Sequence, residues 1–247
     1  CRACAAGAEN YCRVGGVSWP GIDATGFMAD YLIVPSPRHL VPLGDLDPVR
    51  SVPLTDAGLT PYHAIKPSLP KLVPGTTAVV IGVGGLGHLA IQMLRVLSSA
   101  RVVALDISED KLAFAREVGA HLAYLSDPSS IEAVRDLTGG RGVEAVFNFV
   151  GLQEAADLAA KLVGRWSDIA MVGLGPGAIP VGADTLPGGT SVRAPVWGTR
   201  PELFEVLDLA RSGAISVETE RFSLEDGPKA YERLHARTLR GRAVLVP

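Results

Sequence analysis

Apolar and polar residues follow one pattern up to about residue 53 and another from Thr76 onward. The first part is rich in turn formers and prolines, between which lie the short extended pieces Tyr31–Val34 and His39–Pro42. In the second part, short apolar runs alternate with stretches whose apolar residues recur at helical spacing. The first part is therefore predicted to be β-strand and loop, and the second to alternate strands and helices.

The alternation in the second part predicts the fold class. Strands are predicted over 78–81, 102–105, 122–124, 143–147 and 169–172. Helices are predicted over 86–97, 109–118, 131–137 and 154–163. After a Gly/Pro-rich loop, the remainder predicts a β-like run over 192–197, helices over 202–210 and 224–234, and a strand over 243–246. Because parallel strands need crossover helices, the pattern predicts an α/β protein with a doubly wound parallel sheet.

A glycine-rich turn joins the first predicted strand to the first predicted helix. It reads Gly82-Val83-Gly84-Gly85-Leu86-Gly87. Gly82 permits the tight turn, Gly84 lets the backbone approach a pyrophosphate, and Gly87 allows close packing of helix on strand. The helix N-terminus then faces the anion. This turn between a strand and a helix predicts a dinucleotide-binding site.

Asp106 closes the second predicted strand, at about the spacing of twenty residues that the dinucleotide fingerprint requires. Its carboxylate can accept hydrogen bonds from the adenosine ribose and repels the extra phosphate of NADP, so NAD is the expected cofactor. As a helix N-cap, Asp106 is less well placed than Ser108. Lys111 lies close enough to reach the ribose, although a solvated surface lysine explains it equally well.

Composition and charge exclude several classes of function. The 247 residues are 47% hydrophobic and 20% charged, which suits one large or two small globular domains. A net charge of −3 and the lack of a dense basic stretch speak against a nucleic-acid partner. Glycines interrupt the most hydrophobic region before it reaches the ~20 residues of a membrane-spanning helix, so no membrane partner is expected.

The cysteines form one cluster at the start of the chain, namely Cys1, Cys4 and Cys12. Such clustering fits a metal site better than a disulfide framework, and it indicates a reducing, cytoplasmic compartment. A closed structural zinc site takes four ligands. Since the chain starts at Cys1 without a methionine, we expect it to be truncated, with a fourth cysteine upstream.

Several segments resemble zinc-dependent medium-chain alcohol dehydrogenases, above all the bacterial NAD-dependent secondary alcohol dehydrogenases. The resemblance rests on the cysteine cluster and on residues 26–31, 53–64 and 79–88, and it extends over nearly the whole chain. It implies three parts. These are a remnant of a mostly β, GroES-like catalytic domain with a structural-zinc lobe at 1–54, a Rossmann domain at 55–198, and a return to the catalytic domain at 199–247.

The resemblance also implies two zinc ions, a structural one at the cysteine cluster and a catalytic one. Asp56 stands at the position of the family's third catalytic ligand, and a carboxylate oxygen is a competent zinc ligand. Without the resemblance, Asp56 is better explained as a helix N-cap. The remaining ligands and the proton relay are expected upstream of Cys1, because neither His63 nor His88 matches a family ligand.

Four further assignments follow from the resemblance. Arg242 matches an arginine that pairs with the cofactor pyrophosphate, a role that suits a planar guanidinium. The segment beside the nicotinamide is matched by Val172, Gly173 and Leu174. Trp197 matches a substrate-pocket wall, although a core tryptophan explains it nearly as well. Residues 192–196 match an edge strand that pairs across a two-fold axis, so a homo-oligomer, dimer or tetramer, is expected.

Taken together, these features predict a zinc-dependent oxidoreductase that transfers a hydride between a secondary alcohol, or its ketone, and NAD. The printed chain is expected to bind NAD weakly and not to oxidise alcohols by itself. One alternative is a zinc-free quinone reductase of the same superfamily, against which Asp56 and the cysteine cluster speak. Another is a nucleotide-binding module without catalysis, and a methyltransferase would leave both the cysteine cluster and Arg242 unexplained.

Overall fold

The computed structural model describes residues 1–14, 21–22, 24–34 and 36–247, which fall into two units. One unit is Thr60–Trp197, and the other combines Cys1–Leu59 with Gly198–Pro247. In the part of the chain that the structure describes, no helix combines the length and apolar composition that crossing a membrane requires.

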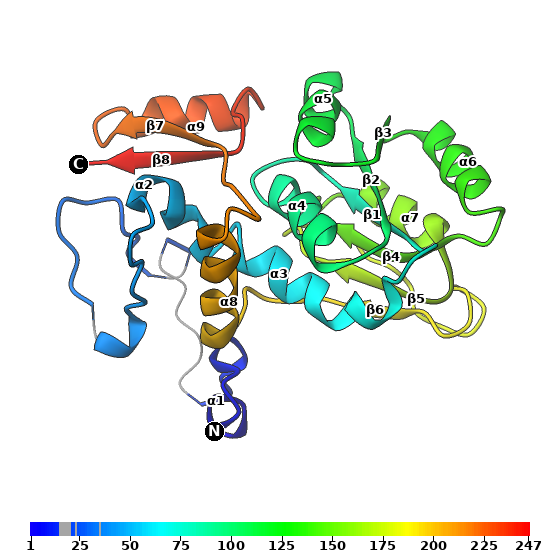
Figure 1. The fold of residues 1–247 in the computed structure, drawn as a ribbon, viewed down its shortest axis with the longest axis horizontal. Helices are drawn as coiled ribbons and strands as arrows, with labels where there is room; N and C mark the ends of the chain where they lie inside the picture. Colours follow the sequence, from blue (N-terminus) through cyan, green and yellow to red (C-terminus); the bar gives the residue numbers. More distant parts are fainter. Residues whose placement is uncertain (15–20, 23, 35) are drawn as a thin grey trace. The chain divides into compact units, whose positions relative to one another are not determined.

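The Thr60–Trp197 unit is built on a six-stranded sheet in the order β3-β2-β1-β4-β5-β6, with every neighbouring pair parallel (Figure 1). Its strands are β1 (Thr77–Ile81), β2 (Arg101–Asp106), β3 (Leu122–Leu125), β4 (Val143–Asn148), β5 (Val163–Met171) and β6 (Ser191–Arg193). Its helices are α3 (Leu59–Ile65), η4 (Lys66–Lys71), α4 (Gly87–Leu97), α5 (Glu109–Glu117), α6 (Pro128–Leu137) and α7 (Gln153–Leu162). The strand order reverses between β1 and β4, and such a switch point is where open α/β sheets bind ligands.

Burial explains why the central strands are continuous apolar runs. Helices α4 and α5 pack on one face of the sheet and α6 and α7 on the other (Figure 1). All five residues of β1 are therefore buried. The core on the α6 and α7 face includes Val79, Ile81, Val103, Leu105, Val134, Val146, Leu158 and Leu162. The predicted α/β class and the doubly wound parallel sheet are confirmed.

The second unit contains short helices and a small sheet. Its elements are α1 (Arg2–Ala5), η1 (Glu9–Tyr11), η2 (Pro37–His39), α2 (Pro48–Ser51), η3 (Val52–Thr55), α8 (Arg200–Arg211), β7 (Thr219–Ser223), α9 (Gly227–His235) and β8 (Arg242–Val246). Strands β7 and β8 pair in parallel. Thr199 and Glu202 begin α8 with a reciprocal capping box, in which each side chain accepts from the other's backbone N–H.

The prediction of β-structure before residue 53 is wrong for the residues that the structure describes. Within these, only an isolated bridge at Ala24 is β, and Tyr31–Val34 forms no strand. The prolines explain the short helices found instead, because Pro37 and Pro48 open η2 and α2 after a capping Ser36 and Asp47. A proline fits the first helical position, where its missing N–H would have no partner.

Candidate functional site

The three predicted glycines of the turn differ in what surrounds them. Gly82 has a φ of +90°, and a Cβ there would lie 2.6 Å from Cγ2 of Val150. A Cβ on Gly87 would lie 1.9 Å from the carbonyl oxygen of Gly82, so the start of α4 is pressed against the turn. A Cβ on Gly84 would meet nothing within 4 Å, and this residue is exposed. Gly82 and Gly87 thus shape the turn, whereas Gly84 leaves open space above it.

Asp106 connects the ends of two neighbouring strands. Its Oδ2 accepts a hydrogen bond of 2.7 Å from the backbone N–H of Val83, and its Oδ1 accepts one of 3.2 Å from Ser108 N–H. Each carboxylate oxygen has a second lone pair for a further donor. Ser108 is the N-cap of α5, as predicted, but its side chain makes no capping hydrogen bond. The carboxylate of Asp106 is therefore fixed beside the glycine turn by backbone donors.

A buried histidine at the start of α4 contacts the backbone of the glycine turn. His88 lies in the first turn of α4 with no exposed surface, and its ring stacks on Phe114 at a centroid distance of 5.5 Å. Its Nδ1 lies 3.0 Å from the carbonyl oxygen of Gly84. Leu86 is the N-cap of α4 and provides no side-chain cap. Helix α4 therefore begins without a capping side chain, and the N–H groups of His88 and Ala90 donate instead to the carbonyl oxygens of Gly84 and Leu86.

The carboxyl ends of β4 and β5 meet at Asn148, which was not singled out from the sequence. The backbone oxygen of Asn148 accepts from the N–H groups of Val172 and Gly173, at 2.8 and 3.1 Å. Its side-chain Oδ1 accepts from Val150 N–H at 2.8 Å. A Cβ on Gly173 would lie 2.5 Å from the carbonyl carbon of Val150. The signal that could have found Asn148 is a buried amide at the end of an apolar strand.

The structure places the remaining predicted cofactor and pocket residues as follows. Lys111 lies half-buried in the first turn of α5, at the end of β2 that carries Asp106. Leu174 is 83% exposed beyond the end of β5. Trp197 ends the Thr60–Trp197 unit with a φ of +52° and is 40% exposed. The predicted edge strand 192–196 is shorter than expected, because β6 ends at Arg193, and it does lie at the edge of the sheet.

Asp56 and Arg242, predicted to serve different ligands, contact each other. Nη2 of Arg242 lies 3.2 Å from Oδ2 of Asp56, and their side chains are 36% and 51% exposed. Asp56 follows the last turn of η3 as its C-cap, so the alternative interpretation as an N-cap is wrong. Among the residues that the structure describes, Asp56 belongs to no group of three potential metal ligands. A catalytic zinc site is therefore not assembled around it within those residues.

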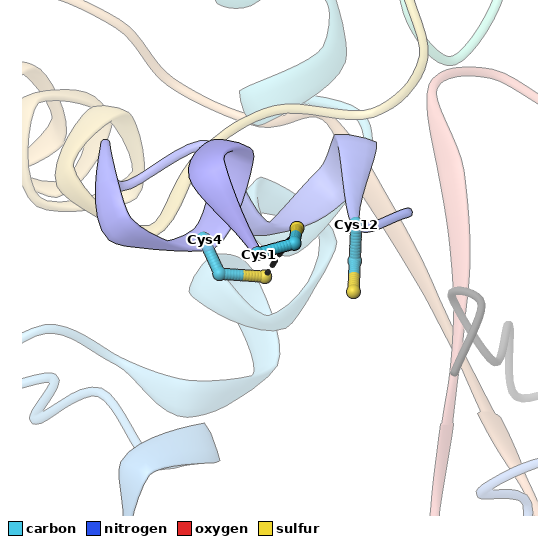
Figure 2. A group of neighbouring side chains, drawn as sticks. All are labelled: Cys1, Cys4 and Cys12. Carbon is cyan, nitrogen blue, oxygen red and sulfur yellow. Dashed lines mark hydrogen bonds between the residues drawn. The ribbon is translucent and has the colours of Figure 1, made fainter. Parts of the chain in front are cut away.

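The cysteine cluster does form a group of metal ligands. Cys1 is the N-cap of α1, Cys4 lies within that helix and Cys12 follows η1, and their sulfur atoms all lie within 4.8 Å of one another (Figure 2). The sulfur atoms of Cys1 and Cys4 are 3.7 Å apart. Tetrahedral zinc with Zn–S bonds of about 2.3 Å would place two sulfur ligands about 3.8 Å apart. The three thiols therefore fit three corners of a structural zinc site.

The cluster's thiols influence one another's ionisation. The hydrogen bond with Cys12, followed by burial, raises the pKa of Cys4 above its usual value. The hydrogen bond to the backbone of Val14 is the largest influence on Cys12 and lowers the pKa of its thiol, and the hydrogen bond with Cys4 lowers it further. The opposite directions are expected when two close thiols share one proton, because the first negative charge opposes formation of the second.

Comparisons with known proteins find relatives over nearly the whole chain. Residues 85–212 match the family model described as zinc-binding dehydrogenase. An NAD-dependent alcohol dehydrogenase of Sulfolobus acidocaldarius is 31% identical over 99% of this chain and 71% of its own length. A D-arabinose 1-dehydrogenase (NADP(+)) of Saccharolobus solfataricus is 32% identical over 100% of this chain and 71% of its own. The crystal structure of an alcohol dehydrogenase from Aeropyrum pernix matches with a TM-score of 0.92 and 34% identity, covering 100% of this chain and 72% of that one.

Proposed function

Because the chain belongs to the zinc-binding dehydrogenase family, we propose that it is an oxidoreductase that binds NAD and transfers a hydride between NAD and an alcohol. A secondary alcohol, with the corresponding ketone as product, is the proposed substrate class. NAD binding is assigned to the Thr60–Trp197 unit and hydride transfer to the carboxyl ends of its parallel strands.

The observation that carries the proposal is the pairing of an open glycine turn with a fixed carboxylate. The space above Gly84 and the uncapped start of α4 can receive a pyrophosphate, whose charge is stabilised by the helix N-terminus. The fixed carboxylate of Asp106 then stands one strand away, where the adenosine ribose follows the pyrophosphate. Gly85 and Leu86 complete the turn, and Lys111 is proposed to donate to the same ribose.

Asp106 is also the basis for proposing NAD over NADP. Family membership alone does not decide this, since one relative is named for NADP(+). An adenosine 2′-phosphate would add roughly two negative charges beside the carboxylate of Asp106. Ile107, which follows, is 66% exposed and offers no positive charge to balance them. The ribose hydroxyls of NAD, in contrast, can donate to the free lone pairs of Asp106.

The nicotinamide end of the cofactor is assigned to the ends of β4 and β5. Val172, Gly173 and Leu174 follow β5 there, and Asn148 holds the first two by their backbone N–H groups. The close approach at Gly173 keeps this loop fixed against the loop that follows β4. Hydride transfer needs such a fixed surface, because the nicotinamide ring and the carbinol carbon must be held in contact.

Zinc is proposed at two sites, one supported by a cluster of three thiols and the other by a single carboxylate. The cysteine cluster fits a structural zinc ion, for which Cys1, Cys4 and Cys12 would supply three thiolates. A catalytic zinc ion, which polarises an alcohol oxygen and lowers its pKa, is assigned Asp56 as one ligand. Since the described residues assemble no ligand group around Asp56, we derive no catalytic step through this ion. Arg242 is proposed as a pyrophosphate ligand, and it holds the Asp56 carboxylate in this structure.

Two measurements on the protein test the proposal. Calorimetric titration with NAD should show one site per chain, and NADP should bind more weakly. A second assay tests hydride transfer separately: the protein is mixed with NAD, propan-2-ol and zinc, and NADH formation is measured by its absorbance. NAD binding without NADH formation would restrict the described chain to a nucleotide-binding role, and failure to bind NAD would refute the dinucleotide site itself.

A further inference from the structure

We propose a second ligand site, for a small hydroxylated oxyanion, in a cavity at the amino end of the parallel sheet. The cavity has a volume of about 410 Å³ and is lined by Arg141, Gly142, Val143, Glu144, Gly164 and Arg165. These residues precede or begin β4 and β5, whereas the glycine turn follows β1 at the opposite end of the strands. The cavity is thus distinct from the proposed NAD site, and its size falls within the range of about 300–1,000 Å³ typical of small-molecule pockets.

The cavity arises from an irregularity in the pairing of β4 and β5. Val143 pairs with Val163 and Ala145 with Asp168, so Glu144 alone stands opposite the four residues 164–167. A bulge of this kind bends the strand and changes the direction of its side chains, and bulges recur beside functional sites. Here it directs Arg165 to the cavity.

Two backbone segments touch without side chains between them, which brings two arginines to the same cavity. A Cβ on Gly164 would lie 2.3 Å from the carbonyl oxygen of Arg141. Gly142 has a φ of +79°, and a Cβ on it would lie 2.6 Å from the nitrogen of Gly164. Any side chain at these glycines would push the segments apart. The two glycines therefore keep Arg141 and Arg165 on the rim of one cavity.

Within the bulge, the backbone is held in an unfavourable conformation. Trp166 has a φ of +59°, a region that bulky side chains rarely enter, and it is 67% exposed. The Nζ of Lys71 lies 5.5 Å above its ring, and the same ammonium group bonds Asp168 at 2.8 Å. Such strain persists only when the surroundings impose it, and it is concentrated at binding sites. Lys71 holds both Trp166 and Asp168, so the bulge that positions Arg165 is fixed on both sides.

The charges lining the cavity define the class of ligand. Arg141 and Arg165 are exposed, and among the residues that the structure describes neither guanidinium forms an ion pair or side-chain hydrogen bond. Each guanidinium can therefore bind a carboxylate or phosphate group through two parallel hydrogen bonds. Glu144 uses Oε2 to accept from Thr77 N–H at 2.7 Å, and its other oxygen remains for a donor. A ligand that carries an oxyanion for the arginines and a hydroxyl for Glu144 satisfies all three groups.

The proposal is tested by calorimetric titration with glycerol 3-phosphate and with glycerate, which separate phosphate from carboxylate as the anionic group. The protein should bind at least one of them, and glycerol, which lacks an anion, should not bind. Arg141→Gln and Arg165→Gln should each weaken binding by roughly tenfold or more, the range for hydrogen bonds to charged groups. Arg135→Gln, the same charge change at an exposed position of α6, should leave binding unchanged.

Saturation with NAD should also leave this binding unchanged, because the two sites lie at opposite ends of the strands. NAD affinity should be preserved in all three arginine variants, which shows that they fold and separates this proposal from the dehydrogenase proposal. The second site would be refuted if neither anion bound, if Arg135→Gln weakened binding as much as the cavity variants, or if NAD displaced the anion.

Discussion

Asp106 combines a structural role and a proposed recognition role in one side chain. Its two oxygens accept from the backbone at Val83 and Ser108, which ties the end of β2 to the glycine turn. A substitution that removes both oxygens would therefore disturb the turn as well as the contact with the ribose. The charge and the acceptor must be changed separately to tell the two roles apart.

Asp106→Asn removes the charge and keeps one acceptor oxygen of the same geometry. We expect NADP to gain affinity relative to NAD by about tenfold, since about 1.4 kcal/mol of repulsion corresponds to that factor. The free energy of unfolding should fall by about 1–3 kcal/mol, because the amide nitrogen of Asn cannot accept and one of the two backbone N–H donors loses its acceptor. Dissociation constants for both cofactors, with denaturant unfolding as the control, provide the measurement. An unchanged preference would show that another residue discriminates.

Cys4 tests the proposed structural zinc ion. Cys4→Ser removes one of three thiols that lie within 4.8 Å of one another, so zinc bound at the cluster should be lost and the unfolding temperature should fall. Native mass spectrometry of the purified protein counts the metal. Asp184→Asn serves as the control, because this exposed residue lies outside that cluster and is assigned to no zinc site. Equal zinc content in the wild type and Cys4→Ser would contradict the assignment.

At the scale of elements, the sequence predicted those helices and strands that leave a recognisable pattern of apolar residues along a short stretch of chain. Strands β1 to β4 and helices α4 to α7 were expected near their observed bounds, because buried parallel strands are continuous apolar runs and amphipathic helices repeat at 3.6 residues. Strand β5 begins at Val163, six residues before the predicted start at residue 169, because its first part contains exposed Arg165 and Trp166. Strand β7 was missed, because its residues Thr219–Ser223 are mostly polar and their partner β8 lies far along the chain. Non-local pairing of this kind leaves no short-range pattern.

The same distinction applies to the candidate site. The glycine turn and Asp106 were predictable, because the fingerprint is a local spacing that backbone sterics impose. The contact between Asp56 and Arg242 was not, since 186 residues separate them. The hydrogen bonds of Asn148 depend on the register between β4 and β5, and a register between distant strands cannot be derived from one sequence.

The glycine turn offers a matched pair of variants. Gly87→Ala places a Cβ 1.9 Å from a carbonyl oxygen of the turn, so we expect it to lower the free energy of unfolding by about 3 kcal/mol, as overpacking does. Gly84→Ala meets no atom within 4 Å, so stability should stay within about 0.5 kcal/mol of wild type. Because its methyl group occupies the space proposed for the pyrophosphate, Gly84→Ala should nevertheless weaken NAD binding.

Urea unfolding and NAD titration of both variants provide the measurement. A stable Gly84→Ala protein with wild-type NAD affinity would show that the pyrophosphate does not approach this part of the turn. If the Gly87→Ala protein were as stable as the wild type, the close contact between Gly87 and the carbonyl oxygen of Gly82 would be contradicted.

At the scale of the whole molecule, the chain divides its chemistry between two units. The unit Thr60–Trp197 contains the glycine turn, Asp106 and the cavity at the amino end of the sheet. The other unit contains Asp56, Arg242 and the cysteine cluster. Mutations in the glycine turn and mutations in the cysteine cluster are therefore expected to have separable effects, on dinucleotide binding and on zinc binding respectively.

The central claim is that NAD binds across the carboxyl ends of β1 and β2. Hydrogen–deuterium exchange of the protein with and without saturating NAD, read by mass spectrometry of peptides, tests it most directly. We expect NAD to slow exchange in peptides that contain residues 82–88 and 106–108, with Cys1–Cys12 unaffected. NAD binding without slower exchange in either of the first two segments would contradict the account.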